Sequence, residues 1–145
     1  MRRIVLFFIS LLTGFAAQAQ LSGFRHLTVS DGLVGMQINC FCKDSHGFMW
    51  IGTETGISCY DGLSFTNYQS HYQDPTALPD NRIESIQEDS EGTLWIRSNE
   101  SYVVMDPVTR LVDRAVSQRL SMLGNNLEPS LVFVDKNANL WVYVK

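Results

Sequence analysis

The sequence predicts an all-β chain built from four-stranded antiparallel units that repeat about every 45 residues. Three observations lead to this prediction. The three tryptophans, Trp50, Trp95 and Trp141, are 45 and 46 residues apart. An aspartate lies six residues before each of them. Short apolar stretches alternate with turn-forming residues, and the 45% apolar fraction is that of an ordinary globular chain.

The first residues have the pattern of a secretory signal peptide. Two arginines are followed by an apolar run over residues 4–15 and then by small residues that end at Ala19. This run is shorter than the roughly 20 apolar residues that a membrane-spanning helix needs. We therefore expect residues 1–19 to be removed by cleavage between Ala19 and Gln20, which makes 20–145 the exported chain.

The charge of the chain indicates which partners it can bind and where it is located. Eleven basic and fifteen acidic residues give a net charge of −4, and the basic residues do not cluster. A nucleic-acid partner is therefore not expected, because such binding relies on a concentrated positive surface. With the export signal, the acidic composition is compatible with a periplasmic protein.

A D-x-x-G-x-x-W motif organises each unit. The aspartate can accept hydrogen bonds from amides of its own turn, and glycine can adopt a positive φ angle there, so each motif predicts a β-hairpin with tryptophan just after the turn. In the third copy Ala138 replaces glycine, and we expect Asn137 or Asn139 to take the left-handed position instead. The complete set is Asp44, Gly47 and Trp50; Asp89, Gly92 and Trp95; and Asp135 and Trp141.

The positions of the strands follow from the spacing of these motifs. In the first unit, Gly52, Thr53 and Gly56 mark a second turn, whereas Asn99 and Ser101 occupy the matching turn of the second unit and leave its geometry open. The stretch 109–126 suits a fourth strand and loop better than a short helix. The predicted strands are 38–43, 48–51, 57–60 and 63–68 in unit one, 83–88, 93–96 and 102–105 in unit two, and 131–134 and 139–144 in unit three.

Four short antiparallel strands per repeat are typical of a β-propeller blade. We expect blade one at about 34–68, blade two at about 79–113 and a truncated blade three at about 129–145. Closed propellers have about 4 to 8 blades, so we expect these blades to form an incomplete propeller, most simply the opening portion of a longer protein and alternatively the product of a truncated gene. Because open blades expose edges and half-buried faces, the array alone is expected to fold poorly or aggregate.

We expect the recurring residues to have structural rather than ligand-binding roles. The aspartates are expected to brace turns and the tryptophans to pack between neighbouring blades, although stacking of a ligand on the tryptophans is an alternative. For ligand binding the weak candidates are His71 and Tyr72 in a loop between the units, which otherwise reads as a simple connection.

No catalytic, metal or cofactor motif is evident in the sequence. The three cysteines read as small buried side chains, and the three histidines are far apart and lack metal-ligand spacing. A carboxylate pair for glycoside hydrolysis is recognised by the distance between its two groups in space, so the sequence leaves the presence of such a pair open. These cysteines and histidines are Cys40, Cys42, Cys59, His26, His46 and His71.

Two segments carry a family resemblance. Residues 24–33 read FRHLTVSDGL, and residues 43–53 read KDSHGFMWIGT, followed by Gly56 and Tyr60-Asp61. Together they resemble two-component regulator propeller repeats, the sensor region of hybrid two-component systems. Sialidases and quinoprotein dehydrogenases have a similar turn, but their glycine follows the aspartate by two and by four residues, not three.

The resemblance implies an exported sensor rather than an enzyme. In that family a β-sandwich linker, one membrane helix, a histidine kinase and usually a response regulator follow the propellers. The implied parent is a homodimer anchored in the inner membrane, which senses an oligosaccharide and contacts the membrane only through its downstream regions. The alternative is an exported propeller enzyme such as a polysaccharide lyase or a glycosidase.

Overall fold

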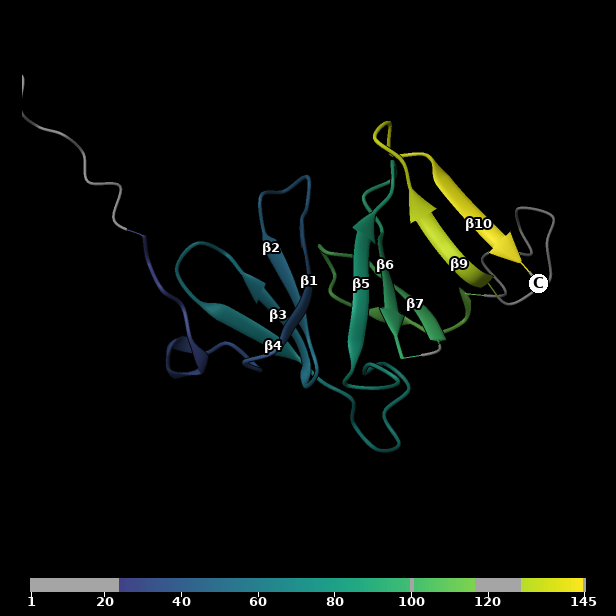
Figure 1. Cartoon of the computed structure of the whole chain (residues 1–145). Helices are drawn as coiled ribbons and strands as arrows, with labels where there is room; N and C mark the ends of the chain where they lie inside the picture. Colours follow the sequence, from purple (N-terminus) through teal and green to yellow (C-terminus); the bar gives the residue numbers. More distant parts are fainter. Residues whose placement is uncertain (1–23, 100, 117–128, 145) are drawn as a thin grey trace, which may run out of the picture.

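The structure is a computed structural model that describes residues 24–99, 101–116 and 129–144. The predicted signal peptide and its cleavage site at Ala19 and Gln20 lie outside these ranges. The described chain forms three antiparallel sheets that stand side by side (Figure 1). Among the described residues, no helix has the length and apolar character needed to cross a membrane.

Each sheet is one repeat of the sequence, and its strands are hydrogen-bonded in chain order. The all-β fold of four-stranded antiparallel blades is thereby confirmed, and the array of blades is not closed. We call the sheets blades 1, 2 and 3. Blade 1 contains β1 (Ile38–Lys43), β2 (Met49–Thr53), β3 (Gly56–Tyr60) and β4 (Phe65–Tyr68), blade 2 contains β5 (Ile83–Glu88), β6 (Leu94–Ser98), β7 (Ser101–Met105) and β8 (Val112–Asp113), and blade 3 contains β9 (Pro129–Val134) and β10 (Leu140–Val144).

The stretch that suited a fourth strand and loop is only partly described. Val112 and Asp113 form β8, which pairs with Met105 and Val104 of β7. Residues 117–128 lie outside the described ranges.

The turn after each aspartate uses a positive φ angle at its fourth residue. This angle is 94° at Gly47, 80° at Gly92 and 61° at Ala138. The prediction that Asn137 or Asn139 would take the left-handed position is therefore wrong. The hairpin register fixes that conformation at the fourth residue, so Ala138 adopts it despite the steric cost of its Cβ atom.

The β2–β3 and β6–β7 turns have the same length but place the positive φ angle differently. Thr53 pairs with Gly56, and Ser98 pairs with Ser101, so each turn has two central residues. In blade 1 the positive φ angle is at Gly56, whereas in blade 2 it is at Asn99. Asparagine tolerates the left-handed region better than most residues, which explains how blade 2 forms this turn without glycine.

Every blade has a front face and a back face, because side chains alternate along each strand. On the front of blade 2, Ile86, Ile96 and Val103 lie side by side on adjacent strands, and they pack against Trp50 and Ile57 on the back of blade 1. Each blade thus contributes its back face to the seam with the blade that follows it.

The second seam repeats this arrangement. Val132 and Val142, on the front of blade 3, pack against Trp95, Tyr102 and Val104 on the back of blade 2. The core of the described chain therefore lies in two seams between blades rather than inside any one sheet.

The segment before β1 covers the outer part of the front face of blade 1. The backbone N–H of Val34 donates to Ser58 Oγ (2.9 Å), and Asn67 Nδ2 donates to the carbonyl of Gly32 (2.9 Å). A 3₁₀ turn, η1 (Val29–Asp31), precedes this contact and is capped by Thr28. The segment leaves the inner part of the face, at β1, uncovered, and Phe41 is exposed there.

Candidate functional site

Each tryptophan is tied to the aspartate of its own motif. The indole Nε1–H donates to the aspartate Oδ2 at 2.8 Å for Trp50, 2.7 Å for Trp95 and 3.1 Å for Trp141. The other carboxylate oxygen of each aspartate accepts the backbone N–H four residues on, at 2.8–3.0 Å. One carboxylate therefore closes the turn and orients the ring that follows it.

The three tryptophans differ in their burial. Trp50 is fully buried and Trp95 is 3% exposed, whereas Trp141 is 62% exposed because no described strand packs on the back of blade 3. The rings of Trp50 and Trp95 are thus inaccessible to a stacking ligand in this structure.

The aspartate of the third turn, Asp135, has a lowered pKa. Hydrogen bonds from the Asn139 side chain and from Trp141, together with the Asn139 backbone N–H, lower the pKa of Asp135 to about 2. Hydrogen bonds to a carboxylate favour its ionised form, so the turn of blade 3 relies on a negative charge at this position.

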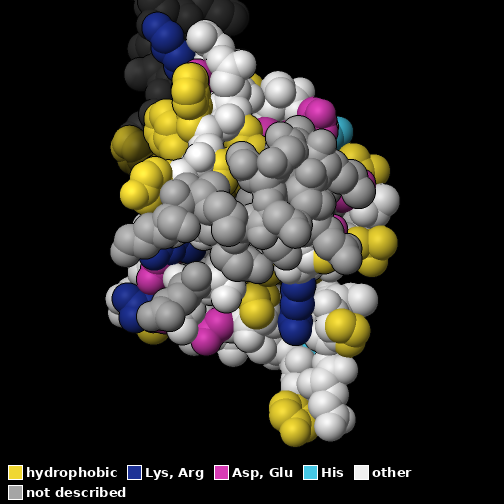
Figure 2. All heavy atoms as spheres, turned by 90° about the vertical axis from the view of Figure 1, so that its right-hand side faces the viewer, with side chains coloured by type: hydrophobic (Ala, Val, Ile, Leu, Met, Phe, Trp, Pro, Cys, Tyr) yellow, Lys and Arg dark blue, Asp and Glu magenta, His cyan; other side chains and the backbone are white. Residues whose placement is uncertain are grey.

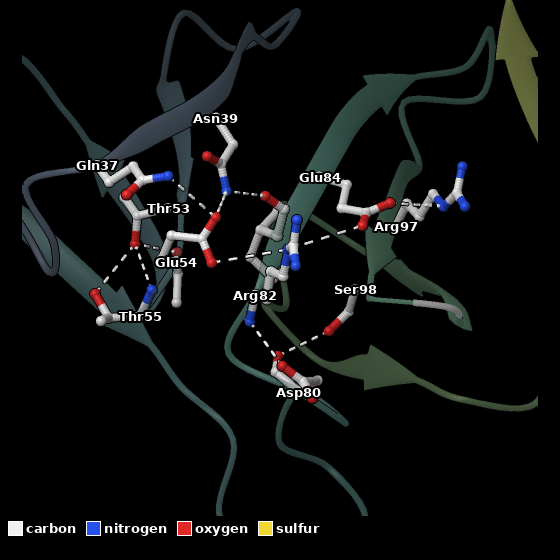
Figure 3. Close-up of polar contacts among 12 residues, drawn as sticks. Gln37, Asn39, Thr53, Glu54, Thr55, Asp80, Arg82, Glu84, Arg97 and Ser98 are labelled. Atoms are coloured by element: carbon white, nitrogen blue, oxygen red, sulfur yellow. Dashed lines mark hydrogen bonds and ion pairs between the residues drawn. The ribbon is translucent and has the colours of Figure 1, made fainter.

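A row of alternating charges begins at the seam between blades 1 and 2 and continues within blade 2 to Arg97 (Figure 3). Arg82 Nε lies 3.7 Å from Glu54 Oε2 and 3.9 Å from Glu84 Oε1, and Glu84 Oε2 lies 3.0 Å from Arg97 Nε. We call Glu54, Arg82, Glu84 and Arg97 the polar row. Its side chains are between 33% and 57% exposed, so the row is open to solvent and its two negative and two positive charges balance.

Two amide side chains join the polar row from blade 1. Asn39 Nδ2 donates to Glu54 Oε1 (3.1 Å) and to the carbonyl of Ile83 (2.8 Å), and Gln37 Nε2 donates to Glu54 Oε1 (3.4 Å). The row therefore lies where β1 and β5 begin and where β2 and β6 end. Carboxylate, guanidinium and amide groups of this kind are suited to a ligand rich in hydroxyl groups.

Arg97 is incompletely satisfied in this row. Its Nε is close enough to Glu84 for an ion pair, but the geometry is not that of a hydrogen bond, and this buried atom has no hydrogen-bond partner among the described residues. Its guanidinium carbon lies 5.8 Å from the centre of the Tyr102 ring. Because Nε is enclosed, a ligand could contact Arg97 only through the exposed part of its side chain, which is 35% exposed.

The loop before β5 holds the two ligand candidates from the sequence. Arg114 anchors this loop, because its guanidinium donates to the carbonyls of Asp74, Ala77 and Leu78 at 2.7–3.0 Å. His71 and Tyr72 are exposed, and no described contact joins either side chain to the polar row. Their role in binding stays a prediction.

The cysteines are unpaired in the structure. Cys59 is buried, and Cys40 and Cys42 are half-buried on the back of blade 1. Burial raises the pKa of the Cys40 thiol to about 11. Among the described residues, no group of three His, Cys, Asp or Glu side chains is placed to hold a metal ion.

The polar row was not predicted from the sequence, because the pattern of recurring residues does not include it. Asn39 and Glu84 occupy matching positions of the two blades, as do Gly52 and Arg97, so the row consists of residues that differ between repeats. Charged residues within predicted strands, as in IESIQE and LWIRS, are the signal that could have found it.

The comparisons with known proteins agree with this architecture. Residues 32–55 and 77–100 match the family model described as "Two component regulator propeller". The chain contains two-component regulator propeller repeats. The matched segments cover β1 to β2 and β5 to β6, including both turns with an aspartate, a glycine and a tryptophan.

Two solved structures are similar over most of the chain. Both are of the extracellular domain of BT4673 from B. thetaiotaomicron, named as a one component system in one case and as a hybrid two component system in the other. The TM-scores are 0.55 and 0.53, and the sequence identities are 24% and 25%. In both cases the alignment covers 85% of this chain.

The same alignments cover 18% of the BT4673 chains, so this chain spans about a fifth of the length of the proteins it resembles. No curated protein matches the sequence. The chain thus resembles a segment of the extracellular sensor propeller of hybrid two-component systems.

Proposed function

We propose that the chain is the periplasmic ligand-sensing propeller segment of a hybrid two-component sensor, and that its polar row binds a neutral oligosaccharide. The observation that supports this most is the row of two carboxylates and two guanidinium groups, 33–57% exposed, that starts at the seam between blades 1 and 2. The regulator propeller repeats supply the sensor context.

The balanced charge of the row favours a neutral ligand. Glu54 and Glu84 can accept hydrogen bonds from sugar hydroxyls, while Arg82 and Arg97 can donate to ring and hydroxyl oxygens. A uronate would gain from the two arginines but would be repelled by the two carboxylates. The exposed ring of Tyr72 supplies an apolar surface in the neighbouring loop.

The position of the row provides a route from binding to signalling. Glu54 belongs to blade 1 and Arg82 to blade 2, so one ligand that contacts both would stabilise the seam between the blades. In the parent protein, this change would favour one arrangement of the sensor dimer, since a ligand shifts an equilibrium by its differential affinity for the two states. The kinase that reads this shift would lie downstream.

Calorimetry with oligosaccharide pools tests the proposal. The probes are partial hydrolysates of neutral plant and yeast polysaccharides, with a uronate-rich hydrolysate for comparison. We expect a neutral pool to bind and Arg97→Ala to weaken its binding at least about tenfold, the effect of losing a charged hydrogen-bond donor. Lys43→Ala, which removes an exposed cation outside the row, is the matched control and should bind as the unmodified chain does.

Two results would argue against this site. One is the absence of binding to any pool by a folded chain, and the other is equal binding by the Arg97→Ala and Lys43→Ala variants. Incubation of the bound pool with the chain separates the sensor from the alternative, an exported lyase or glycosidase. A sensor leaves the oligosaccharides unchanged, whereas either enzyme shortens them.

A further inference from the structure

A β-bulge recurs at the same position in the first strand of all three blades. In each of these strands the register shifts by one residue against the second strand, so one residue is left without a partner there. The unpaired residues are Asn39 of β1, Glu84 of β5 and Ser130 of β9, which are 45 and 46 residues apart. The bulge is therefore a feature of the repeat and not an irregularity of one blade.

The chemistry of the bulge residue changes from blade to blade. The side chain is an amide in blade 1, a carboxylate in blade 2 and a hydroxyl in blade 3, so the number of hydrogen-bond donors and the charge differ each time. The aspartate and the tryptophan of the hairpin motif, in contrast, recur unchanged. Bulges are common next to binding sites because they redirect a side chain. A constant backbone feature with a variable polar side chain is suited to selecting a ligand.

In blade 1 the bulge residue fastens one blade to the next. Asn39 Nδ2 donates to Glu54 Oε1 of its own blade and to the carbonyl of Ile83 in blade 2 (Figure 3). An ionised carboxylate has no donor and can only accept hydrogen bonds. Glu84 therefore cannot fasten blade 2 to blade 3 in the way that Asn39 fastens blade 1 to blade 2.

The Glu84 carboxylate has acceptor capacity for a ligand. It forms ion pairs with Arg82 and Arg97, but among the described residues it accepts no hydrogen bond, and its side chain is 33% exposed. The other carboxylate of the polar row, Glu54, already accepts hydrogen bonds from two amide side chains. Arg97 pairs across the strands with Tyr102, a residue of the second seam. Glu84 and Arg97 thus form the part of the polar row that lies toward blade 3.

Local charges decide which ligand charge this part of the row accepts. Figure 2, which views the chain from the side of β9 and β10, shows basic and acidic side chains interspersed over the described surface. Charges on an exposed surface are screened beyond about 8 Å at physiological ionic strength. A ligand that contacts Arg97 therefore experiences chiefly the neighbouring carboxylate of Glu84, 3.0 Å from Arg97 Nε.

We propose that Glu84 is the specificity-determining residue of the polar row, which accepts hydrogen bonds from the hydroxyl groups of a neutral oligosaccharide and excludes uronates. This inference rests on the proposed function of the row. A uronate carboxylate that approached Arg97 would meet the like charge of Glu84, which already occupies that guanidinium. A neutral sugar can donate its hydroxyl hydrogens to Glu84 without displacing the ion pair.

The Glu84→Gln variant of the full chain tests the proposal by calorimetry with the neutral and the uronate-rich hydrolysates. Glutamine keeps the shape of the side chain but removes its charge and leaves Arg97 free for another carboxylate. Uronate binding should strengthen at least about tenfold, the effect of one hydrogen bond between charged groups, while neutral binding weakens by no more than about threefold. Glu91→Gln makes the same charge change at an exposed residue of the β5–β6 turn and should keep the preference of the unmodified chain.

The outcomes separate this inference from the proposed function. If the unmodified chain binds a neutral pool and Glu84→Gln keeps the same preference as Glu91→Gln, the proposed function stands and the role of Glu84 is overturned. Equal loss of both ligands in Glu84→Gln, with an unchanged circular dichroism spectrum, would also overturn it, because Glu84 would then hold the row together without selecting. An unmodified folded chain that binds no pool would overturn the proposed function, and this inference with it.

Discussion

The seam between blades 1 and 2 and the seam between blades 2 and 3 come from the same repeat but are closed by different interactions. The first contains Gly52 on β2, and an added Cβ there would lie 2.5 Å from Cys40 Sγ and 2.6 Å from an Ile83 side-chain carbon. The second contains Arg97 at the matching position, together with Tyr102 and a smaller apolar cluster. Both seams contain polar contacts, but the first has the larger apolar cluster and no space for a side chain at Gly52, whereas the second accommodates Arg97 at that position.

The polar contacts of the second seam satisfy the inner edge of β9. The backbone N–H of Val132 donates to the Tyr102 hydroxyl (3.0 Å), and that of Val134 donates to Gln87 Oε1 (2.6 Å). In the first seam, Glu88 of blade 2 reaches across to the Asp44 turn of blade 1 and accepts from the N–H and hydroxyl of Ser45. The repeat therefore specifies the hairpin strictly and leaves the seam free to vary.

The largest expected effect follows from the three tryptophans. Trp50→Ala should lower the free energy of unfolding by about 3–5 kcal/mol, because it empties a filled seam and leaves the buried Asp44 carboxylate without the indole donor. Trp95→Ala should cost somewhat less, in the smaller cluster. Trp141→Ala should cost less than about 1 kcal/mol, since its ring is largely exposed. Urea unfolding followed by circular dichroism measures all three, and equal costs would contradict the seam model.

A second prediction distinguishes the two seams by adding a methyl group to the first one. Gly52→Ala should cost about 1–3 kcal/mol, because the new methyl group overlaps Cys40 and Ile83. The matched substitution in the other seam, Arg97→Ala, should change unfolding by less than about 1 kcal/mol, because it only shortens a partly exposed side chain. A Gly52→Ala variant as stable as Arg97→Ala would show that the first seam is looser than described.

A third prediction addresses the polar closure of the second seam. Tyr102→Phe removes the acceptor for the Val132 N–H and should cost about 1–2 kcal/mol, the penalty for a buried donor left without a partner. Amide hydrogen exchange should show faster exchange at Val132, with no change in β1 and β5. Tyr60→Phe serves as a control, because among the described residues its hydroxyl bonds just the carbonyl of Gly62 and an exposed arginine.

The smallest expected effect is a local response to acid in blade 3. The pKa of Asp135 is about 2 when folded, below its ordinary 3.8, so its contribution to stability is complete above about pH 4 and is lost as the pH falls through 2. The NMR signal of the Trp141 indole N–H should therefore titrate near pH 2. Asn139→Ala removes one donor to the carboxylate and should move this titration toward 3.8, and an unchanged titration would contradict the assignment.

The hairpins could be predicted from the sequence, whereas the seams could not. Asp44, Gly47 and Trp50 act through contacts within seven consecutive residues, so their spacing reports the turn directly. Glu54 and Arg82 meet only because two sheets pack, and Arg97 replaces a glycine of the first repeat, so no local pattern reports them. At Ala138 the local residue preference gave the wrong prediction. The hairpin requires a positive φ angle at this position, and this requirement overrides the preference of alanine for a negative one.

The central claim is that each blade is fixed by an indole packed against the blade that follows it. Hydrogen exchange of the three indole N–H groups in the folded chain tests it most directly. We predict that exchange is slowest at Trp50, faster at Trp95 and fastest at Trp141, in the order of their exposure. Exchange at Trp50 as fast as at Trp141 would contradict the claim.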